Sequence, residues 1–240
     1  MPEESYVIRV EDVHKVYSTG STVTWALLGV NLNVKRGSFI TIMGPSGSGK
    51  TTLLNLIGLL DRPTKGKIYI DGVDTSRLKD QELAEFRNKK IGFVFQAFNL
   101  INRLSVIENI ELPLVARGVA KEERRRMAIE ALMKAGGDLS WVNKRPNQLS
   151  GGQQQRVAIA RAIVGSPTIL LADEPTGNLD TSSAKVVVKT FLELNKHGQT
   201  IVVITHNPEV AHCSQGIYVM RDGRIVSTLS PDPSKCLIYQ

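Results

Sequence analysis

The segment Gly44–Thr51, with the sequence GPSGSGKT, constrains the fold of this chain more than any other. It matches the pattern G-x-x-x-x-G-K-[ST] at every fixed position. An apolar run at 39–43 precedes it and a helix-forming stretch at 52–57 follows it, and this pattern requires such a strand–loop–helix context. The segment therefore predicts a phosphate-binding loop, and a simple glycine-rich turn is the less favoured interpretation.

The residue types in this loop suit the binding of a polyphosphate. Glycine has no Cβ, so the backbone can turn several N–H groups toward the phosphates, and the following helix adds its positive N-terminal end. Lys50 supplies a mobile positive charge for the β- and γ-phosphates, and the Thr51 hydroxyl is the expected ligand of Mg²⁺. The expected nucleotide-binding residues here are Gly44, Pro45, Ser46, Gly47, Ser48, Gly49, Lys50, Thr51 and Thr52.

The chain is basic, with a formal net charge of +7 and clusters of Lys and Arg at 62–67, 87–90 and 124–126. Such clusters suit nucleic acid or an anionic membrane surface. No aromatic residues interleave with these charges, however, and stacking on bases would require them. A solvated surface near an anionic ligand is the favoured interpretation, and we expect no nucleic-acid partner.

Length and cysteine content bound the class of protein. The 240 residues suffice for one large domain, or for one domain with a substantial insertion. No run approaches the roughly 20 apolar residues of a membrane span, and residues 1–5 lack the apolar core of a signal peptide. Cys213 and Cys236 lie far apart and outside metal-type spacing, which argues against a disulfide or a zinc site. We expect a cytoplasmic protein and assign the cysteines no role.

Apolar patterns along the chain predict an α/β fold. Short β-type runs before the loop are typical of a small antiparallel layer with a turn at 18–21, and later continuous apolar runs are typical of buried parallel strands. The segment 99–147 contains helical runs and is expected to form an inserted α-helical subdomain. The predicted strands lie at 6–10, 23–28, 31–34, 67–70, 91–95, 168–172, 200–204, 217–220 and 224–226, and the predicted helices at 52–57, 77–90, 121–133, 154–164 and 181–197.

Polar residues follow three of the buried runs directly. In an open α/β sheet, ligands lie outside the carboxyl ends of the strands, so these side chains are expected to face the loop. Asp173 is the natural second anchor for Mg²⁺, and Glu174 is placed to accept a proton from water. Two adjacent buried carboxylates are costly unless a metal offsets them, which favours a functional role for the pair.

The other two strand-end residues are weaker candidates. His206 is expected to contact the γ-phosphate, and Gln96 to reach the metal ion or the attacking water. A single polar residue after a strand is as often a cap or turn residue as a catalytic one. The candidate catalytic residues are Glu174, His206 and Gln96, and the candidate metal ligands are Thr51, Gln96 and Asp173.

Two further features suggest ligand contacts. Tyr17 stands at the end of a β-type run, where its ring could stack on a purine base or simply pack. The segment Leu149–Gln153, LSGGQ, opens a helix with Ser150 as its expected N-cap, and is called the signature segment below. A second glycine-rich helix start indicates a second anion site.

Taken in order, these motifs resemble the nucleotide-binding subunit of an ATP-binding-cassette transporter. The resemblance covers nearly all of the 240 residues. The motifs that carry it are Gly44–Thr51, Gln96, Leu149–Gln153, Ile169–Glu174, Asn178–Asp180 and His206. The segments Phe93–Gln96, Glu111–Leu114 and Pro146–Leu149 are similar to the lipoprotein-release and macrolide-export branch of that family.

The resemblance implies a fold and a pairing of subunits. The fold is a P-loop NTPase core with a mainly parallel sheet, an N-terminal antiparallel β subdomain and an inserted α-helical subdomain. The chain would be one nucleotide-binding domain, with its core at about 1–98 and 148–240 and its helical subdomain at about 99–147. The resemblance also implies that Tyr17 stacks on adenine, and that Asp180 lies near an interface with a second copy. Ser150, Gly152 and Gln153 would contact the γ-phosphate held by that copy.

The implied function is ATP hydrolysis, dependent on Mg²⁺, in an ATP-dependent antiparallel dimer that drives a separate transmembrane permease. The chain would lie on the inner face of the cell membrane and serve export or lipoprotein release. The alternative is a scaffold or regulator of a membrane complex, of the cell-division type, with little dependence on turnover. A DNA-repair cassette is disfavoured because the chain lacks a long coiled-coil insertion. Two departures from common family patterns, Asn178 and Asn207, remove no catalytic group.

Overall fold

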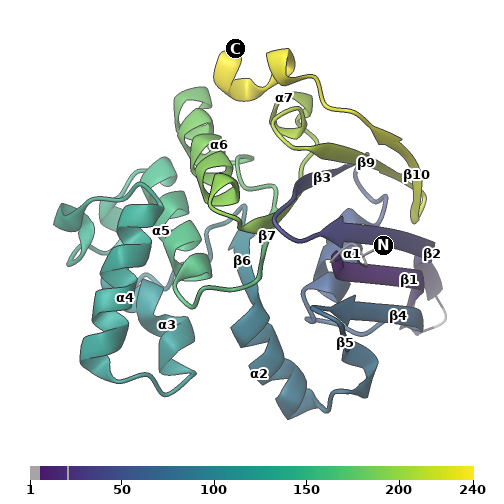
Figure 1. The fold of residues 1–240 in the computed structure, drawn as a ribbon, viewed down its shortest axis with the longest axis horizontal. Helices are drawn as coiled ribbons and strands as arrows, with labels where there is room; N and C mark the ends of the chain where they lie inside the picture. Colours follow the sequence, from purple (N-terminus) through teal and green to yellow (C-terminus); the bar gives the residue numbers. More distant parts are fainter. Residues whose placement is uncertain (1–5, 21) are drawn as a thin grey trace, which may run out of the picture.

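Two β-sheets form the framework of the computed structural model, which describes residues 6–20 and 22–240 (Figure 1). Residues 1–5, which were tested for a signal peptide, and Ser21 of the predicted turn lie outside this range. The antiparallel sheet has the order β2-β1-β4-β5, and the larger sheet the order β10-β9-β3-β8-β7-β6. The strands are β1 Tyr6–Thr19, β2 Thr22–Lys35, β3 Phe39–Met43, β4 Lys65–Ile70, β5 Val73–Asp74, β6 Ile91–Phe95, β7 Ile169–Asp173, β8 Thr200–Ile204, β9 Gly216–Arg221 and β10 Arg224–Leu229.

Some helices pack against the larger sheet, and those of the insertion form a separate cluster (Figure 1). No helix in the described residues is both long enough and apolar enough to cross a membrane. The helices are α1 Lys50–Ile57, α2 Asp80–Lys90, α3 Val106–Val115, α4 Lys121–Lys134, α5 Gly151–Ile163, α6 Thr181–Lys196 and α7 Pro208–Ala211. The predicted P-loop core, the antiparallel β subdomain and the helical insertion are all confirmed.

The parallel pairing of the larger sheet explains why the candidate residues gather at one edge. β3 pairs in parallel with β8 and β9, β8 with β7, and β7 with β6. The loops that follow β3, β6, β7 and β8 therefore leave the same edge of the sheet. These loops carry the phosphate-binding loop, Gln96, the Asp173–Glu174 pair and His206.

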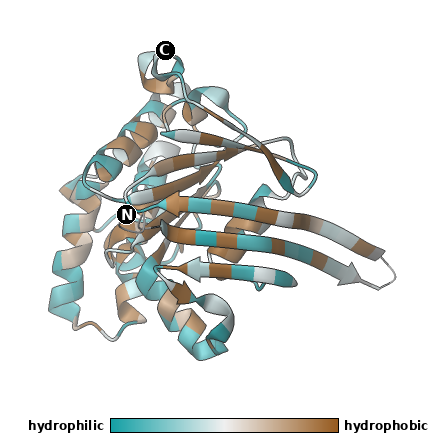
Figure 2. Ribbon diagram, turned by 45° about the vertical axis from the view of Figure 1, so that its right-hand side comes forward, coloured by the Kyte–Doolittle hydropathy of each residue, from teal (hydrophilic) through white to brown (hydrophobic). Residues whose placement is uncertain are grey.

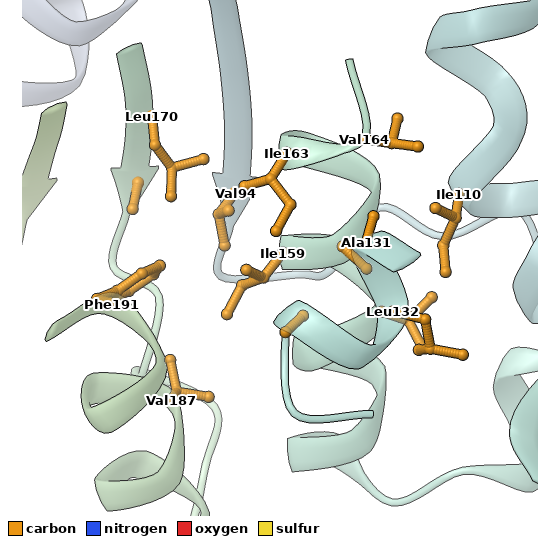
Figure 3. Packing of buried hydrophobic residues seen from close by; sticks show 14 of the residues in the cluster. Val94, Ile110, Ala131, Leu132, Ile159, Ile163, Val164, Leu170, Val187 and Phe191 are labelled. Atoms are coloured by element: carbon orange, nitrogen blue, oxygen red, sulfur yellow. The ribbon is translucent and has the colours of Figure 1, made fainter. Parts of the chain in front are cut away.

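Alternate residues of the buried strands feed two separate hydrophobic cores. On β7, Leu170 and Ala172 belong to one core, while Ile169 and Leu171 belong to the other. This alternation follows from the two-residue period of a strand. Figure 3 shows the first core, where Val94 and Leu170 meet helices α5 and α6, and α5 in turn meets α4 and α3. Covering both faces makes the sheet rigid and positions the loops at its edge.

The antiparallel sheet differs from the prediction in the length of its strands. β1 and β2 are each 14 residues long and form one hairpin that projects from the body (Figure 2). Their pairing register shifts between Val10 and Val13, where Asp12 has a φ of 47°. Such a bulge interrupts the alternation of apolar and polar residues. The sequence pattern therefore breaks into shorter runs, although the strands continue.

The prediction for the two cysteines is wrong. Cys213 and Cys236 form a disulfide with an S–S distance of 2.05 Å. The β9–β10 hairpin reverses the chain, so residues that are 23 apart in sequence come within 4.6 Å at their Cα atoms. Both cysteines are buried in the core that α6 covers, together with Leu237. The disulfide ties the C-terminal segment to the end of α7.

Candidate active site

The loop between β3 and α1 has the shape of an anion cradle. A Cβ at Gly44 would lie 2.1 Å from the carbonyl oxygen of Met220, and one at Gly49 would lie 2.5 Å from that of Ala26. Gly49 also has a φ of 96° at the N-cap of α1, and Gly47 has a φ of 77°. Larger residues would therefore displace neighbouring strands or strain the backbone. The glycines keep the loop narrow and its N–H groups accessible.

The ammonium group of Lys50 lies inside the phosphate-binding loop. The Lys50 side chain is 8% exposed, and its Nζ donates hydrogen bonds of 2.8 Å to the carbonyl oxygens of Gly44 and Pro45. Burial lowers the pKa of Lys50, and the carboxylates of Glu174 and Asp173 oppose that shift. A buried cation whose hydrogen bonds go to neutral carbonyls suits a site whose ligand is an anion.

Two further groups in and near the cradle test its fit to a nucleotide and Mg²⁺. The Ser48 hydroxyl is buried and has no hydrogen-bond partner among the described residues, so it can bond a phosphate oxygen. The Thr51 hydroxyl hydrogen-bonds the Asp173 carboxylate. Burial raises the pKa of Asp173, with the nearby Glu174 charge adding to the shift. A hydroxyl and a carboxylate, completed by phosphate oxygens and water, are a donor set that suits Mg²⁺.

No cluster of three or more His, Cys, Asp or Glu side chains in the described part of the chain could hold a metal by itself. Mg²⁺ commonly binds proteins through one or two carboxylates together with substrate phosphates. The site therefore fits a metal that enters with its nucleotide.

A carboxylate and an imidazole meet beside this pair. The Nδ1 atom of His206 lies 2.8 Å from Oε1 of Glu174, and their side chains are 73% and 18% exposed. Glu174 has a φ of 47°, and its N–H donates to the carbonyl oxygen of Ile204 at the end of β8. This bond clamps the residue in a conformation that a non-glycine residue rarely adopts. The imidazole–carboxylate pair can hold and orient a proton.

Tyr17 lies close to the start of α1. Its hydroxyl donates a 3.0 Å hydrogen bond to Asp61 and also bonds the Thr52 hydroxyl. Burial, followed by the hydrogen bond to Asp61, raises the pKa of Tyr17. The Lys15 ammonium lies 4.9 Å from its ring centroid, and the side chain remains 39% exposed. The ring is therefore fixed at its hydroxyl end beside the phosphate-binding loop.

The signature segment lies in a second cluster. Ser150 caps α5, accepting from the Gln153 N–H at 3.3 Å, while Gln153 Oε1 accepts from the Ser150 N–H at 2.9 Å. A Cβ at Gly152 would lie 2.7 Å from the Ser183 hydroxyl, so α5 approaches the start of α6 closely. Asp180 caps α6 and accepts from the Ser183 N–H at 2.9 Å. These four candidates form a surface of two adjoining helix N-termini.

Hydrogen bonds to its own helix control the charge of Asp180. The hydroxyls of Ser182 and Ser183 donate to its carboxylate at 2.6 and 2.7 Å. These bonds, followed by the Ser183 N–H, lower the pKa of Asp180 well below its usual range. Asp180 is therefore ionised throughout the neutral range.

Gln96 does not share a hydrogen bond with Thr51 or Asp173 in the described chain; its amide bonds Asn178 instead. Nε2 of Gln96 donates to Oδ1 of Asn178 at 3.0 Å, and Nδ2 of Asn178 donates to the Gln96 carbonyl oxygen at 3.1 Å. Asn178 belongs to one of the motifs that carry the family resemblance and departs there from a common family pattern. The sequence contains no signal that this residue contacts Gln96, 82 positions away.

Two other residues of this region were also missed. Gln155 is fully buried on α5, and its Nε2 donates to the carbonyl oxygens of Phe95 and Pro175 at 3.3 and 2.7 Å. Its spacing from Gly152 and Ile159 places it on the buried face of the helix. A polar side chain on such a face needs a hydrogen-bond partner, and that is the sequence signal that could have identified it. Asp61, the hydrogen-bond partner of Tyr17, is not among the predicted site residues.

Comparisons with known proteins agree with this architecture. The model of the family described as "ABC transporter" matches residues 27–177. An uncharacterised ABC transporter ATP-binding protein of Thermotoga maritima is 52% identical over 220 residues, which cover 91% of this chain and 93% of that protein. The macrolide export ATP-binding/permease protein MacB of Syntrophobacter fumaroxidans is 47% identical over 221 residues, covering 91% of this chain but 31% of that protein.

The solved structures of MJ0796, an ABC transporter cassette from Methanocaldococcus jannaschii, are also similar. A dimeric structure of it has a TM-score of 0.86 at 48% identity, covering 94% of this chain and 99% of that one. A second structure, a dimeric post-hydrolysis state bound to ADP and Pi, has the same TM-score at 47% identity and the same coverage. The chain belongs to the ATP-binding-cassette transporter family as an ATP-binding protein, and is similar to the lipoprotein-release and macrolide-export branch.

Proposed function

We propose that the chain binds ATP with Mg²⁺, pairs with a second copy of itself, and hydrolyses ATP to drive a transmembrane permease of the export or lipoprotein-release type. The observation that carries the proposal is the convergence of Lys50, Thr51, Asp173, Glu174 and His206 at one edge of the larger sheet. Gly44 to Thr52 would bind the phosphates, with Lys50 turning from its loop carbonyls to the β- and γ-phosphates. Mg²⁺, when bound, would neutralise charge on those phosphates.

The proposed reaction is ATP + H₂O to ADP + phosphate. Glu174 would accept a proton from the attacking water molecule. The oxygen of that water would bond the γ-phosphorus while the bond between the γ-phosphorus and the oxygen shared with the β-phosphate breaks. His206, bonded through Nδ1 to that carboxylate, would contact the γ-phosphate and keep Glu174 oriented. Thr51, Asp173 and Gln96 would be the metal ligands. The exposed ring of Tyr17 would stack on adenine.

The proposed dimer assigns a role to the second cluster. Ser150, Gly152 and Gln153 present a helix N-terminus at which a partner's γ-phosphate could bind, with Asp180 beside it. The dimeric structures of MJ0796 support this arrangement. The length of MacB beyond the matched region, together with its name as an ATP-binding/permease protein, supports a membrane partner. The chain would then lie on the inner face of the cell membrane.

A cleft beside Gln96 is the proposed contact for that partner. It has a volume of about 610 Å³ and lies between α2, β6, α3 and α5, and Asn99, Leu112 and Pro113 are the residues of 99–114 that line it. Phe93 and Phe95 line it, with their ring centroids 5.6 Å apart and the rings stacked, and Leu112 lines it as well. Apolar residues line this cleft together with Arg87, Arg117 and Arg161, a combination that suits a short amphipathic segment of the permease.

Leu112→Glu should uncouple transport while leaving basal ATP hydrolysis unchanged, because a charge in the cleft opposes apolar docking. Val115→Glu is the matched control, since Val115 lies on the same helix, is 50% exposed and does not line the cleft. Both variants would be assayed for ATPase activity and for transport in membranes that contain the permease. Normal transport by Leu112→Glu would contradict the proposed contact.

Glu174→Gln tests the proposed reaction directly. The amide cannot accept the proton, so we expect a loss of turnover of about 10²-fold or more with retained ATP binding. The variant should also accumulate an ATP-stabilised dimer, measured by size-exclusion chromatography with light scattering. Glu193→Gln is the control, because Glu193 lies 3.6 Å from His197 in an exposed Glu–His pair on α6. An unimpaired hydrolysis rate in Glu174→Gln would remove Glu174 from the mechanism.

A further inference from the structure

A reciprocal pair of hydrogen bonds joins the loop after β6 to the loop after β7. Gln96 donates from Nε2 to Oδ1 of Asn178 at 3.0 Å, and Asn178 donates from Nδ2 to the Gln96 carbonyl oxygen at 3.1 Å. The pair therefore links the candidate metal ligand Gln96 to the turn that follows Glu174.

The bonding pattern fixes which end of each amide is which. A backbone carbonyl oxygen can only accept, so the Asn178 atom facing it must be the NH₂ group. The other Asn178 atom is then the acceptor Oδ1, and the Gln96 atom facing it must be the donor Nε2. With its nitrogen used in this way, Gln96 keeps Oε1 as the amide atom that can bind a cation. Amide oxygens are ligands of Mg²⁺, whereas the NH₂ nitrogen is not.

Gly177 is shaped to receive the same side chain. A Cβ at Gly177 would lie 2.7 Å from Nε2 and 3.0 Å from Cδ of Gln96. Gly177 is absent from the glycines with positive φ, so its backbone does not require glycine. Its lack of a side chain therefore provides space for the Gln96 amide. The Gly177 N–H donates to the Glu174 carbonyl oxygen at 3.0 Å, so Gly177 is hydrogen-bonded to the residue proposed as the proton acceptor.

A separate residue holds the backbones of the two loops together. Gln155 bonds the carbonyl oxygens of Phe95 and Pro175, the residues next to Gln96 and Glu174. Because Gln155 is fully buried beneath them, the loop positions do not depend on Asn178 alone. Asn178 is left to control the orientation of the Gln96 side chain.

We propose that Asn178 is a positioning residue for Gln96. Asn178 holds Nε2 of Gln96 in the space beside Gly177, so that Oε1 of Gln96 is free to bind the metal ion. The inference rests on the proposed role of Gln96 as a metal ligand. Removing the hydrogen bond frees the amide to rotate, so metal binding weakens while nucleotide binding persists.

Asn178→Leu removes both hydrogen bonds and keeps a similar side-chain volume. The probe is Mn²⁺ titrated into the full chain with one equivalent of a non-hydrolysable ATP analogue, with free Mn²⁺ measured by electron paramagnetic resonance. One neutral hydrogen bond contributes about three- to tenfold to an equilibrium, so the Mn²⁺ dissociation constant should rise by that factor. The affinity for the analogue without metal should stay unchanged. Asn143→Leu, an exposed asparagine on the helical insertion, is the matched control.

Gly177→Ala provides a second, independent perturbation should Asn178→Leu fold poorly. The three atoms nearest to the added methyl group all belong to the flexible Gln96 side chain, so we expect the fold to tolerate it. It should displace the amide and raise the Mn²⁺ dissociation constant in the same direction. In a Gln96→Ala background the methyl group meets no amide, so Gly177→Ala and Asn178→Leu should each add no further effect.

The outcomes separate this inference from the function on which it rests. A shift in Gln96→Ala without one in Asn178→Leu and Gly177→Ala overturns the positioning role and leaves Gln96 as a ligand. Additive effects in the double variants also overturn it, because Asn178 would then act by another route. Unchanged Mn²⁺ binding in all variants, Gln96→Ala included, overturns both the positioning role and the proposed metal role of Gln96.

Discussion

The Lys50 ammonium occupies an unusual position for a single charged group. It is buried and donates hydrogen bonds to the carbonyl oxygens of Gly44 and Pro45, and burial lowers its pKa against the opposing effect of the Glu174 and Asp173 carboxylates. Burying a cation costs free energy, which the neutral acceptors and these carboxylates offset only in part until an anion binds. The residue that the proposed function needs most is therefore a local liability for the nucleotide-free fold.

Lys50→Met should separate these two effects. Loss of a charge-assisted contact of about 1.5–3 kcal/mol should weaken ATP binding by about 10- to 100-fold, measured by isothermal titration calorimetry. Without nucleotide, the midpoint of thermal unfolding should stay equal or rise, because methionine fills the space without a buried charge. Lys189→Met, an exposed substitution on α6, should change neither quantity. Normal ATP affinity in Lys50→Met would count against the phosphate-binding role of the loop.

Ionic contacts join several of the secondary-structure elements, and Asp71 makes two of these contacts. It lies in the turn between β4 and β5, bonds Lys90 at the end of α2 at 2.5 Å, and also bonds Arg36 after β2. The Lys90 hydrogen bond, followed by that of Arg36, lowers the pKa of Asp71 from its ordinary value of 3.8. A carboxylate with a depressed pKa stabilises the fold above its ordinary pKa. That contribution disappears as the pH falls through the pKa of the folded state.

Asp71→Asn should therefore destabilise the chain in a pH-dependent way. Asparagine tolerates the φ of 52° at this turn, so the backbone should be retained. At pH 7 we expect the free energy of unfolding to fall by about 1 kcal/mol, and the difference from the parent chain should shrink below about pH 3.8. Urea unfolding at pH 7 and pH 3 measures both values. Asp80→Asn is the control, since Asp80 pairs with Arg62 while 97% exposed. An equal penalty at both pH values would exclude the charge of Asp71 as its source.

At this scale the sequence predicted most elements but not their contacts. Periodicity placed β6 and β8 at their observed bounds and α4 within one residue, since these segments are long or uniformly apolar. It shortened β1 and β2, because a bulge near Asp12 breaks the pattern. Contacts between loops, such as Gln96 with Asn178 or Cys213 with Cys236, depend on strand order and chain reversal. A single sequence does not determine such pairings.

The candidate site was predictable to a similar extent. The strand-end rule brought Asp173, Glu174 and His206 to one edge, and the structure joins the last two at 2.8 Å. The sequence did not single out Gln155, because it lies in a run of three glutamines. Only the packing of α5 shows which of the three is fully buried. The location of candidate residues at motif positions was therefore predictable, while the residues that hold them in place were not.

For the whole molecule, the two clusters of candidate residues lie on two separate surfaces. The phosphate-binding loop forms one, and the starts of α5 and α6 form the other. In the proposed antiparallel dimer each surface would complete a site on the partner. The two surfaces should then respond differently to mutation, because the first would bind nucleotide in one subunit and the second would act only across the interface.

Ser150 allows this difference to be tested, because its structural role can be preserved while its charge is changed. Ser150 caps α5, and Asp and Asn are equally good N-caps. In the Glu174→Gln background, Ser150→Asp should keep the thermal stability and the ATP affinity of the single chain. A carboxylate placed against a partner's γ-phosphate should nevertheless prevent the ATP-dependent dimer, because like charges repel across a desolvated contact. Ser150→Asn, the uncharged isostere, should lose less of the dimer in the same light-scattering assay. If Ser150→Asp dimerises as well as Ser150→Asn, the signature segment faces no phosphate, and the ATP site is complete within one chain.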